Sequence, residues 1–197
     1  MSCMSDWPVV KGDYQVGNGK SRICVVTLAS HFELASEYMK KVALIGPCHT
    51  ENLGIEKIIA NVVSNPNIRF ILICGEESRG HMSGNTLRAI HANGIDGNGR
   101  IIGSEGAIPF IENISEAAVK RFQAQVQLID RTGETDKGKI LQIIEEYHNK
   151  GNVFSEPPMV VQAGKKKRKR ERLEINGTGD VVISKDVSLD TSSGIIA

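Results

Sequence analysis

His81 follows an apolar, strand-like run of residues and stands between two glycines. The run at 68–74 is almost unbroken in apolar residues, and Gly75 interrupts it. In an open α/β sheet, ligands bind outside the carboxyl ends of the strands, which is where His81 is expected to lie. Gly80 and Gly84 keep the backbone beside it small enough for a flat, bulky ligand to approach. An imidazole presented in this way suits a metal-bearing cofactor, with His81 as the metal ligand.

Two further segments are candidates for contact with the same ligand. The first, residues 50–52, is expected to open a helix after a strand-end loop, and helix N-termini attract anions and polar groups. Plain capping by Thr50 explains this segment equally well. The second, residues 103–107, is either a loop small enough to admit the ligand or a turn that needs glycine for a positive φ. The candidate cofactor contacts are therefore Thr50, Glu51, Asn52, Gly80, His81, Gly84, Gly103, Gly106 and Ala107.

Other combinations of reactive residues point to no site. A set made of Cys48, His49, Cys74 and His81 matches no zinc-site spacing. The GNG at 97–99 does not follow a strand and open a helix, as a dinucleotide fingerprint does. The remaining histidines are interpreted as structural or solvent-facing: His31, His49, His91 and His148. We therefore predict no catalytic side chain beyond a bound cofactor.

Size and charge indicate one substantial α/β core. The chain has 197 residues, of which 40% are hydrophobic, and its net charge of +1 argues against a nucleic-acid binder. It shows no secretory signal, and its four cysteines have no paired spacing, so a cytoplasmic location is predicted. No apolar stretch approaches the ~18 residues that are needed to span a bilayer.

The apolar patterns predict strands that alternate with helices. Residues 42–45 either finish a helix or form a strand of their own, and residues 1–21 form an extended arm or an edge hairpin. The alternation predicts a mostly parallel sheet with helices on both faces. Strands are expected at 23–28, 68–74, 100–103 and 126–129, and helices at 31–43, 50–65, 83–92, 115–125 and 136–149.

A change in composition near residue 160 divides the chain. We predict an α/β domain at 1–160, followed at 161–197 by a basic linker and a flexible polar tail. In that tail, 173–175 and 181–183 would form a small hairpin about an Asn-Gly turn. The run KKKRKR at 165–170 is interpreted as a solvated linker or as a contact for an anionic membrane surface.

Six stretches of the chain, in order, resemble the corrinoid-carrying A subunit of tetrahydromethanopterin S-methyltransferase from methanogenic archaea. They are WPVVKGDYQVGN (7–18), VVTLASH (25–31), GPCHTENLGIEKIIANVVSNPNIRF (46–70), GHMSG (80–84), IHANGID (90–96) and GAIPFIENI (106–114). The loop at 80–84 also resembles the Asp-x-His-x-x-Gly motif of cobalamin-binding proteins in general, although Arg79 stands where that motif has Asp.

The resemblance implies a Rossmann-like α/β fold that binds a cobalamin-type corrinoid, with His81 as the lower axial ligand of cobalt. It implies a methyltransferase subunit that works within a complex and is not active alone. The complex would pass a methyl group from methyl-tetrahydromethanopterin by way of cobalt to coenzyme M, with coupling to sodium transport. Because Arg79 replaces the Asp, we expect His81 to lack a carboxylate partner and to be a weaker, more easily released ligand.

The chain departs from the family pattern after about residue 164. There the basic run and polar tail replace the hydrophobic helix that anchors these A subunits in the membrane. One interpretation is a family member recruited to the inner face of the cell membrane by its partner subunits or by the basic run. A second is a soluble paralogue that carries methyl groups to another acceptor, and a third is a non-catalytic corrinoid store or sensor. The sequence leaves the three interpretations open.

Overall fold

The computed structural model describes residues 6–161 together with the short segments 181–184, 187–190 and 195–196. The chain divides into two compact units, residues 1–165 and 166–197, which are described separately. The basic run at 165–170 and the expected strand at 173–175 lie outside the described residues.

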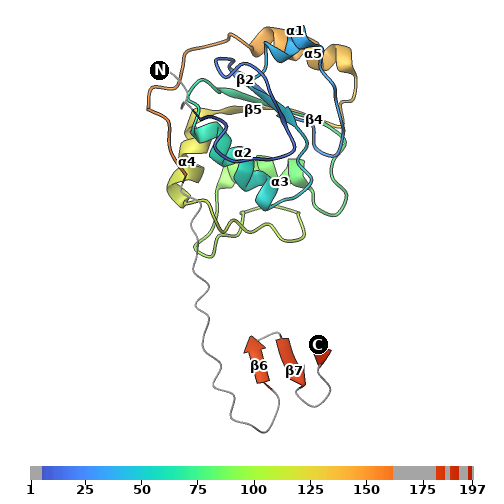
Figure 1. The fold of residues 1–197 in the computed structure, drawn as a ribbon, viewed down its shortest axis with the longest axis vertical. Helices are drawn as coiled ribbons and strands as arrows, with labels where there is room; N and C mark the ends of the chain where they lie inside the picture. Colours follow the sequence, from blue (N-terminus) through green and yellow to red (C-terminus); the bar gives the residue numbers. More distant parts are fainter. Residues whose placement is uncertain (1–5, 162–180, 185–186, 191–194, 197) are drawn as a thin grey trace. The chain divides into compact units, whose positions relative to one another are not determined.

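A five-stranded sheet forms the centre of the first unit (Figure 1). Its strands are β1 (Gln15–Val16), β2 (Ile23–Val26), β3 (Leu44–Gly46), β4 (Phe70–Gly75) and β5 (Gln127–Thr132), in the spatial order β1-β3-β2-β4-β5. Strands β2 to β5 run parallel to one another, whereas β1 pairs antiparallel with β3 at one edge. The predicted mostly parallel sheet is confirmed.

Helices cover both faces of this sheet, as the alternation of elements predicted (Figure 1). The side chains of β4 show why: Ile71 and Ile73 pack on one face, and Leu72 and Cys74 on the other, all of them buried. The first face is covered by α2 (Leu53–Val63), α3 (Ser83–Asn93) and α4 (Glu116–Gln125), and the second by α1 (Ser36–Met39) and α5 (Lys137–Tyr147). None of the helices in the described parts of the chain is long and apolar enough to span a membrane.

The helix α2 forms where it was predicted because its buried residues follow a helical stripe. Ile55, Ile59 and Val62 face the core, and the helix ends before Pro66. Its first residue is Leu53 rather than Thr50, because Asn52 occupies the N-cap and accepts a hydrogen bond from the Leu53 N–H.

Two predicted elements are wrong. The helix expected at 31–43 is reduced to α1, and of the ambiguous residues 42–45 the last two, Leu44 and Ile45, belong to strand β3. Phe32, Leu34 and Tyr38 nevertheless pack against the core of the second face, so their spacing reflects burial and not a continuous helix. The strand expected at 100–103 is replaced by two isolated bridges, Ile95 with Ile101 and Arg100 with Phe110.

The second unit contains a three-stranded antiparallel sheet in the order β6-β7-β8. Its strands are β6 (Val181–Ser184), β7 (Val187–Asp190) and β8 (Ile195–Ile196). The expected strand at 181–183 is confirmed as β6, and the partner that the structure describes for it is β7.

Candidate functional site

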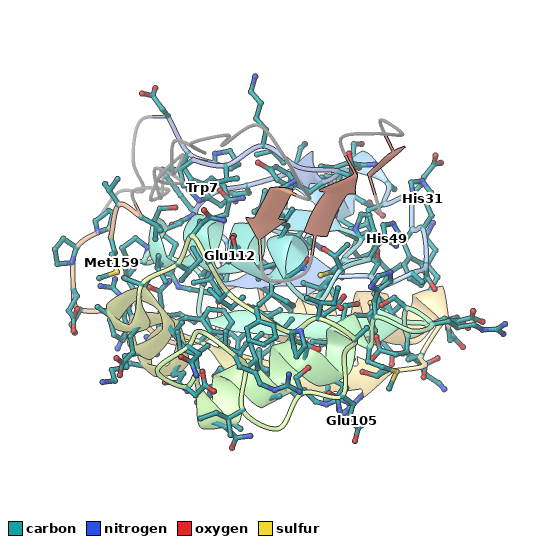
Figure 2. All side chains as sticks on the ribbon, turned by 90° about the horizontal axis from the view of Figure 1, so that it is seen from below. Trp7, His31, His49, Glu105, Glu112 and Met159 are labelled. Carbon is teal, nitrogen blue, oxygen red and sulfur yellow. The ribbon has the colours of Figure 1, made fainter. Side chains whose placement is uncertain are left out.

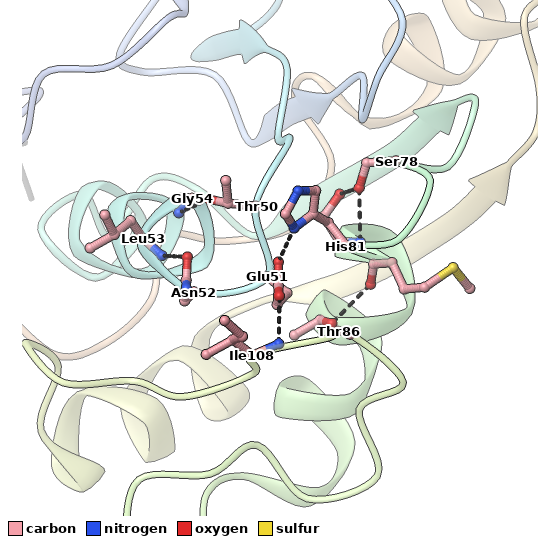
Figure 3. Close-up of polar contacts among 12 residues, drawn as sticks. Thr50, Glu51, Asn52, Leu53, Gly54, Ser78, His81, Thr86 and Ile108 are labelled. Carbon is pink, nitrogen blue, oxygen red and sulfur yellow. Dashed lines mark hydrogen bonds and ion pairs between the residues drawn. The ribbon is translucent and has the colours of Figure 1, made fainter. Parts of the chain in front are cut away.

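His81 and Glu51 meet at the carboxyl edge of the parallel strands (Figure 3). Glu51 lies in the loop after β3, and His81 lies in the loop after β4. Nδ1 of His81 is 2.7 Å from Oε2 of Glu51. The Glu51 side chain is 2% exposed, whereas that of His81 is 53% exposed. A buried carboxylate therefore holds an imidazole that faces solvent.

This contact decides which nitrogen of His81 is available to a ligand. When Nδ1 donates its proton to a carboxylate, the lone pair of the neutral ring lies on Nε2. Nε2 makes no hydrogen bond within the described residues, and the ring turns this nitrogen away from Glu51 (Figure 3). Metal-binding histidines are typically oriented in this way by a carboxylate on the other nitrogen.

The expectation that His81 lacks a carboxylate partner is therefore wrong. Arg79, which occupies the position of the motif's Asp, is exposed and forms no hydrogen bond with the ring. The carboxylate comes instead from Glu51, thirty residues earlier in the chain. The inference that His81 is a weak ligand is therefore also wrong in its premise, because a carboxylate partner is present and such a partner increases the basicity of a ligating imidazole.

Glu51 is itself fixed by a second hydrogen bond. Its Oε1 accepts the backbone N–H of Ile108 at 2.6 Å. Burial by itself raises the pKa of Glu51, but its own backbone N–H, the Ile108 N–H and His81 stabilise the charged form, and together they bring the pKa below its usual value. Glu51 is consequently an anion at neutral pH and can keep the proton of His81 on Nδ1.

The backbone on each side of His81 adopts the left-handed region. Gly80 has φ of 77° and Met82 has φ of 49°, which is uncommon for a residue with a side chain. A Cβ at Gly80 would meet no atom within 4 Å, so only the backbone conformation calls for glycine there. The two left-handed residues turn the chain so that His81 projects outward.

Gly84 has a different explanation, which lies inside the protein. It is buried in α3, and an added Cβ would lie 2.7 Å from Oε2 of Glu77 and 3.0 Å from Leu28. The Glu77 carboxylate accepts the N–H groups of Gly84 and Asn85 at 2.8 and 2.9 Å, and so caps the start of α3. Packing thus accounts for the second glycine, and its contact with a cofactor stays a prediction.

A buried hydroxyl joins the two loops that carry the histidine and the carboxylate. Ser83 is fully buried, and its Oγ donates to the carbonyl oxygen of Cys48, which lies in the loop after β3. Ser78 Oγ lies 2.8 Å from Ser83 Oγ and reinforces the link. Sequence reasoning missed these serines, since nothing in their spacing distinguishes them from ordinary loop residues.

The glycines of segment 103–107 have one turn role and one packing role. Gly103 has φ of 81°, as its interpretation as a turn residue required. Gly106 passes close to the pair formed by His81 and Glu51: an added Cβ would lie 2.7 Å from the His81 carbonyl oxygen and 2.8 Å from Glu51 Cβ. Ala107 is exposed next to it. This predicted segment therefore does reach the candidate site.

The remaining residues of the first predicted segment act as helix caps. Thr50 Oγ1 accepts the N–H of Gly54 at 2.9 Å, and Asn52 Oδ1 accepts the N–H of Leu53 at 2.7 Å. Of the three, Glu51 is the one whose side chain contacts His81 (Figure 3).

The other histidines occupy different environments. His31 projects from the surface (Figure 2), with Nε2 3.9 Å from Glu33. His91 pairs with the Val126 carbonyl oxygen at 2.8 Å, and His148 lies 3.9 Å from Glu145. These contacts agree with a structural or solvent-facing interpretation.

A mostly apolar cavity of about 290 Å³ lies beside the site, between α2 and strands β2 and β3. Residues 12–14 border it, and His49 and Thr50 line the part nearest the site, but His81 and Glu51 do not line it. Cys24 and Cys48 contribute thiols, and burial raises the pKa of both to about 12, so they behave as small apolar groups. No sequence pattern pointed to this cavity.

Replacement of Gly106 by alanine is expected to destabilise the fold by about 1–3 kcal/mol, because the new methyl group overlaps the backbone of His81 and the side chain of Glu51. Urea denaturation measures the loss. Gly97→Ala is the matched control, since Gly97 has open space around it and no left-handed φ. Equal stability of the two variants would contradict the tight approach at Gly106.

Comparison with known proteins gives one consistent family. A family model of the A subunit of tetrahydromethanopterin S-methyltransferase matches residues 1–171. The chain is 55% identical to the A subunit of the methyltransferase Mtx of Methanosarcina barkeri over 190 residues, which are 96% of this chain and 93% of the relative. It is 49% identical over 155 residues to the A subunit (number 2) of tetrahydromethanopterin S-methyltransferase of Methanothermobacter marburgensis. The matched residues are 77% of this chain and 83% of the relative.

A third relative extends the same result to another archaeon. The chain is 48% identical over 158 residues to the A subunit of tetrahydromethanopterin S-methyltransferase of Methanocaldococcus jannaschii, which covers 79% of this chain and 66% of the relative. The resemblance noted from the sequence is thereby confirmed, together with the methyltransferase class. The chain belongs to the family of tetrahydromethanopterin S-methyltransferase A subunits.

Proposed function

We propose that the chain is the corrinoid-carrying subunit of a methyltransferase complex, and that Nε2 of His81 is the axial ligand of the cobalt of a cobalamin-type corrinoid. The observation that carries this proposal is the pair formed by His81 and Glu51. It combines a half-exposed imidazole, an Nε2 that makes no hydrogen bond to any residue that the structure describes, and a buried carboxylate on Nδ1, within a chain of this family.

The donor set fits a metal that brings most of its own ligands. Within the described residues, no three His, Cys, Asp or Glu side chains gather as a metal site would require. A corrinoid would bring most of the cobalt ligands with it, so one imidazole would complete what the protein must provide. Exposed apolar side chains lie at the same edge, with Leu53 58% and Ile108 61% exposed, and they suit contact with a large organic ring.

The residues of the chain then have distinct roles. When bound, the corrinoid supplies the methyl-accepting and methyl-donating chemistry at cobalt. His81 binds and orients it through Nε2, while Glu51 retains the proton at Nδ1 and makes the imidazole more basic. The Ile108 N–H and the Ser83 hydroxyl hold these two groups in place. For the methyl donor and acceptor, we infer methyl-tetrahydromethanopterin and coenzyme M, with other subunits of the complex as partners.

Fold and location complete the proposal. Helices on both faces of the parallel strands support a Rossmann-like assignment of the first unit, with 161–197 as a basic linker and tail. We infer a cytoplasmic protein, held peripherally at the inner face of the membrane by its partner subunits or by the basic run at 165–170. Coupling to sodium transport would then belong to the complex as a whole.

A second candidate function is a carrier paralogue with a different methyl acceptor. The Mtx relative matches 96% of this chain, whereas the relatives from Methanothermobacter and Methanocaldococcus match 77% and 79%. The greater coverage favours a role shared with the Mtx relative.

Methyl transfer by the reconstituted protein tests both candidates. The purified chain, loaded with cobalamin and reduced, is expected to take up a methyl group from methyl-tetrahydromethanopterin when the partner methyltransferase subunit is present. Transfer onward to coenzyme M would support the first candidate, and transfer only to another acceptor would support the second. Cobalamin binding without methyl uptake would indicate the store or sensor, and absence of cobalamin binding would overturn the proposal.

A further inference from the structure

Glu56 is a second buried carboxylate near the site, and all described hydrogen bonds of its side chain come from one loop. It lies in α2 with 6% of the residue exposed. Oε1 accepts the backbone N–H groups of Glu112 and Asn113 at 2.6 and 2.8 Å, and Oε2 accepts Nδ2 of Asn113 at 2.8 Å. No ion pair to Glu56 forms within the described residues. A buried anion needs such compensation, and here the loop supplies it.

The segment that Glu56 holds leads directly back to Ile108. Pairing with the chain at 99–101 keeps it extended: Ile101 donates its N–H to Pro109, and Ile111 donates to Gly99, both at 2.8 Å. Pro109 adds stiffness, because its ring fixes φ. Residues 108–113 therefore form one short segment whose backbone is held by residues 99–101. One end of it contacts Glu51, in the loop before α2, and the other contacts Glu56, in α2.

The other end of this piece is part of the candidate site. The Ile108 N–H donates to Oε1 of Glu51, whose Oε2 lies on Nδ1 of His81. Two carboxylates that are five residues apart thus accept hydrogen bonds from the two ends of residues 108–113: Glu51, just before α2, and Glu56, in its first turn. Loss of the hydrogen bonds to Glu56 would allow residues 108–113 to move away from Glu51.

We propose that Glu56 is a positioning residue of the His81 site. By holding residues 108–113 in place, it maintains the hydrogen bond from the Ile108 N–H to Glu51 and, through it, the hydrogen bond between Glu51 and His81. The proposal deepens the proposed function and rests on it only where cobalt ligation is concerned. The contacts that Glu56 controls exist in the chain by itself.

The contact between Glu56 and Asn113 permits a test by exchange of partners. Asn113→Asp sets two carboxylates against each other and should push the loop off α2. Adding Glu56→Gln should restore the contact, because the Gln amide can donate to the new carboxylate while its oxygen still accepts the two backbone N–H groups. Glu56→Ala removes all three hydrogen bonds. Glu105→Ala is the matched control, since Glu105 lies on the same loop and projects from its surface (Figure 2).

The readout is taken first on the chain without cobalamin. Amide hydrogen exchange at Ile108 is expected to speed up about tenfold or more in Glu56→Ala and Asn113→Asp, as loss of hydrogen bonds to a charged group implies. The NMR signal of the His81 Nδ1 proton should shift with it. Both should return toward the parent values in the double variant and stay unchanged in Glu105→Ala. Circular dichroism establishes that each variant is folded.

The outcomes separate this inference from the proposed function. Parent-like exchange at Ile108 in a folded Glu56→Ala or Asn113→Asp chain would overturn the positioning role, as would a double variant that stays perturbed. If Glu56→Ala fails to fold, Asn113→Asp and its rescue decide the matter. In the cobalamin-loaded chain, the fraction with His81 on cobalt should follow the same order of variants. Absence of His81 ligation in the parent would contradict the proposed function and leave the result without cobalamin standing.

Discussion

Replacement of His81 by alanine is expected to abolish the axial nitrogen signal of the cobalamin-loaded protein. The variant loses the imidazole whose Nε2 faces solvent, and no other histidine within the described residues has a carboxylate on one nitrogen at hydrogen-bond distance. Substitution of a residue that supports a metal ligand lowers the affinity for the metal by up to roughly 100-fold. Loss of the ligand itself should lower the affinity for cobalamin by more than that. Spectroscopic titration measures the affinity. Electron paramagnetic resonance of the cobalt(II) form of chain labelled with ¹⁵N-histidine identifies the nitrogen as the protein's own.

His31→Ala is the control for this experiment, because His31 also lies near a glutamate but is exposed and makes no hydrogen bond to it. It should keep the parent spectrum. Added imidazole should partly restore the axial signal in His81→Ala, since the vacated volume is open to solvent. A parent-like spectrum in His81→Ala would rule out the axial-ligand assignment.

The main elements of the fold could be predicted because burial on both faces leaves a clear pattern. The apolar run that includes β4 needs no polar alternation, since helices cover each side. The apolar stripe of α2 repeats with helical spacing and stops before a proline. The segment at 31–43 misled because Phe32, Leu34 and Tyr38 also pack on the sheet, and apolar spacing alone does not distinguish a helix from a packed irregular segment.

The candidate site contains one residue that neighbouring residues in the sequence reveal and one that only the fold reveals. His81 could be picked out because its strand end and its glycines are adjacent in sequence. Its partner could not, because a hydrogen bond between residues thirty apart depends on how β3 and β4 flank β2. The local motif pointed to Arg79 and to a missing carboxylate, whereas the fold supplies Glu51. The signal that could have found it is that both residues follow strands whose carboxyl ends share one edge.

Replacement of Glu51 by glutamine is expected to weaken axial ligation about 10- to 100-fold while leaving the fold in place. The Gln amide cannot accept hydrogen bonds at both ends. If its oxygen keeps the Ile108 N–H, its NH₂ group faces Nδ1 of His81 and favours the tautomer with the proton on Nε2. That tautomer has no lone pair on Nε2 for cobalt. Cobalamin titration followed by the axial nitrogen signal measures the change.

The same variant should change how stability depends on pH. The pKa of Glu51 is lower in the folded protein than its usual value of 4.5, so the folded state favours the anion. Such a carboxylate contributes stability that is fully present above the unfolded pKa and is lost as the pH falls through the folded pKa. The stability difference between the parent and Glu51→Gln should therefore be largest near neutral pH and shrink below about pH 4.5. Urea denaturation across this range measures it.

Two further variants decide whether the effect belongs to Glu51 in particular. Glu76→Gln makes the same chemical change at an exposed residue just after β4, and it should leave both ligation and the pH dependence as in the parent. Glu51→Asp keeps the charge but shortens the side chain, so it should retain much of the pH dependence and lose part of the ligation. A Glu51→Gln protein that ligates cobalt as the parent does would show that the carboxylate only packs the loop. His81 would then be oriented by the left-handed backbone of Gly80 and Met82 on either side of it, without help from the carboxylate.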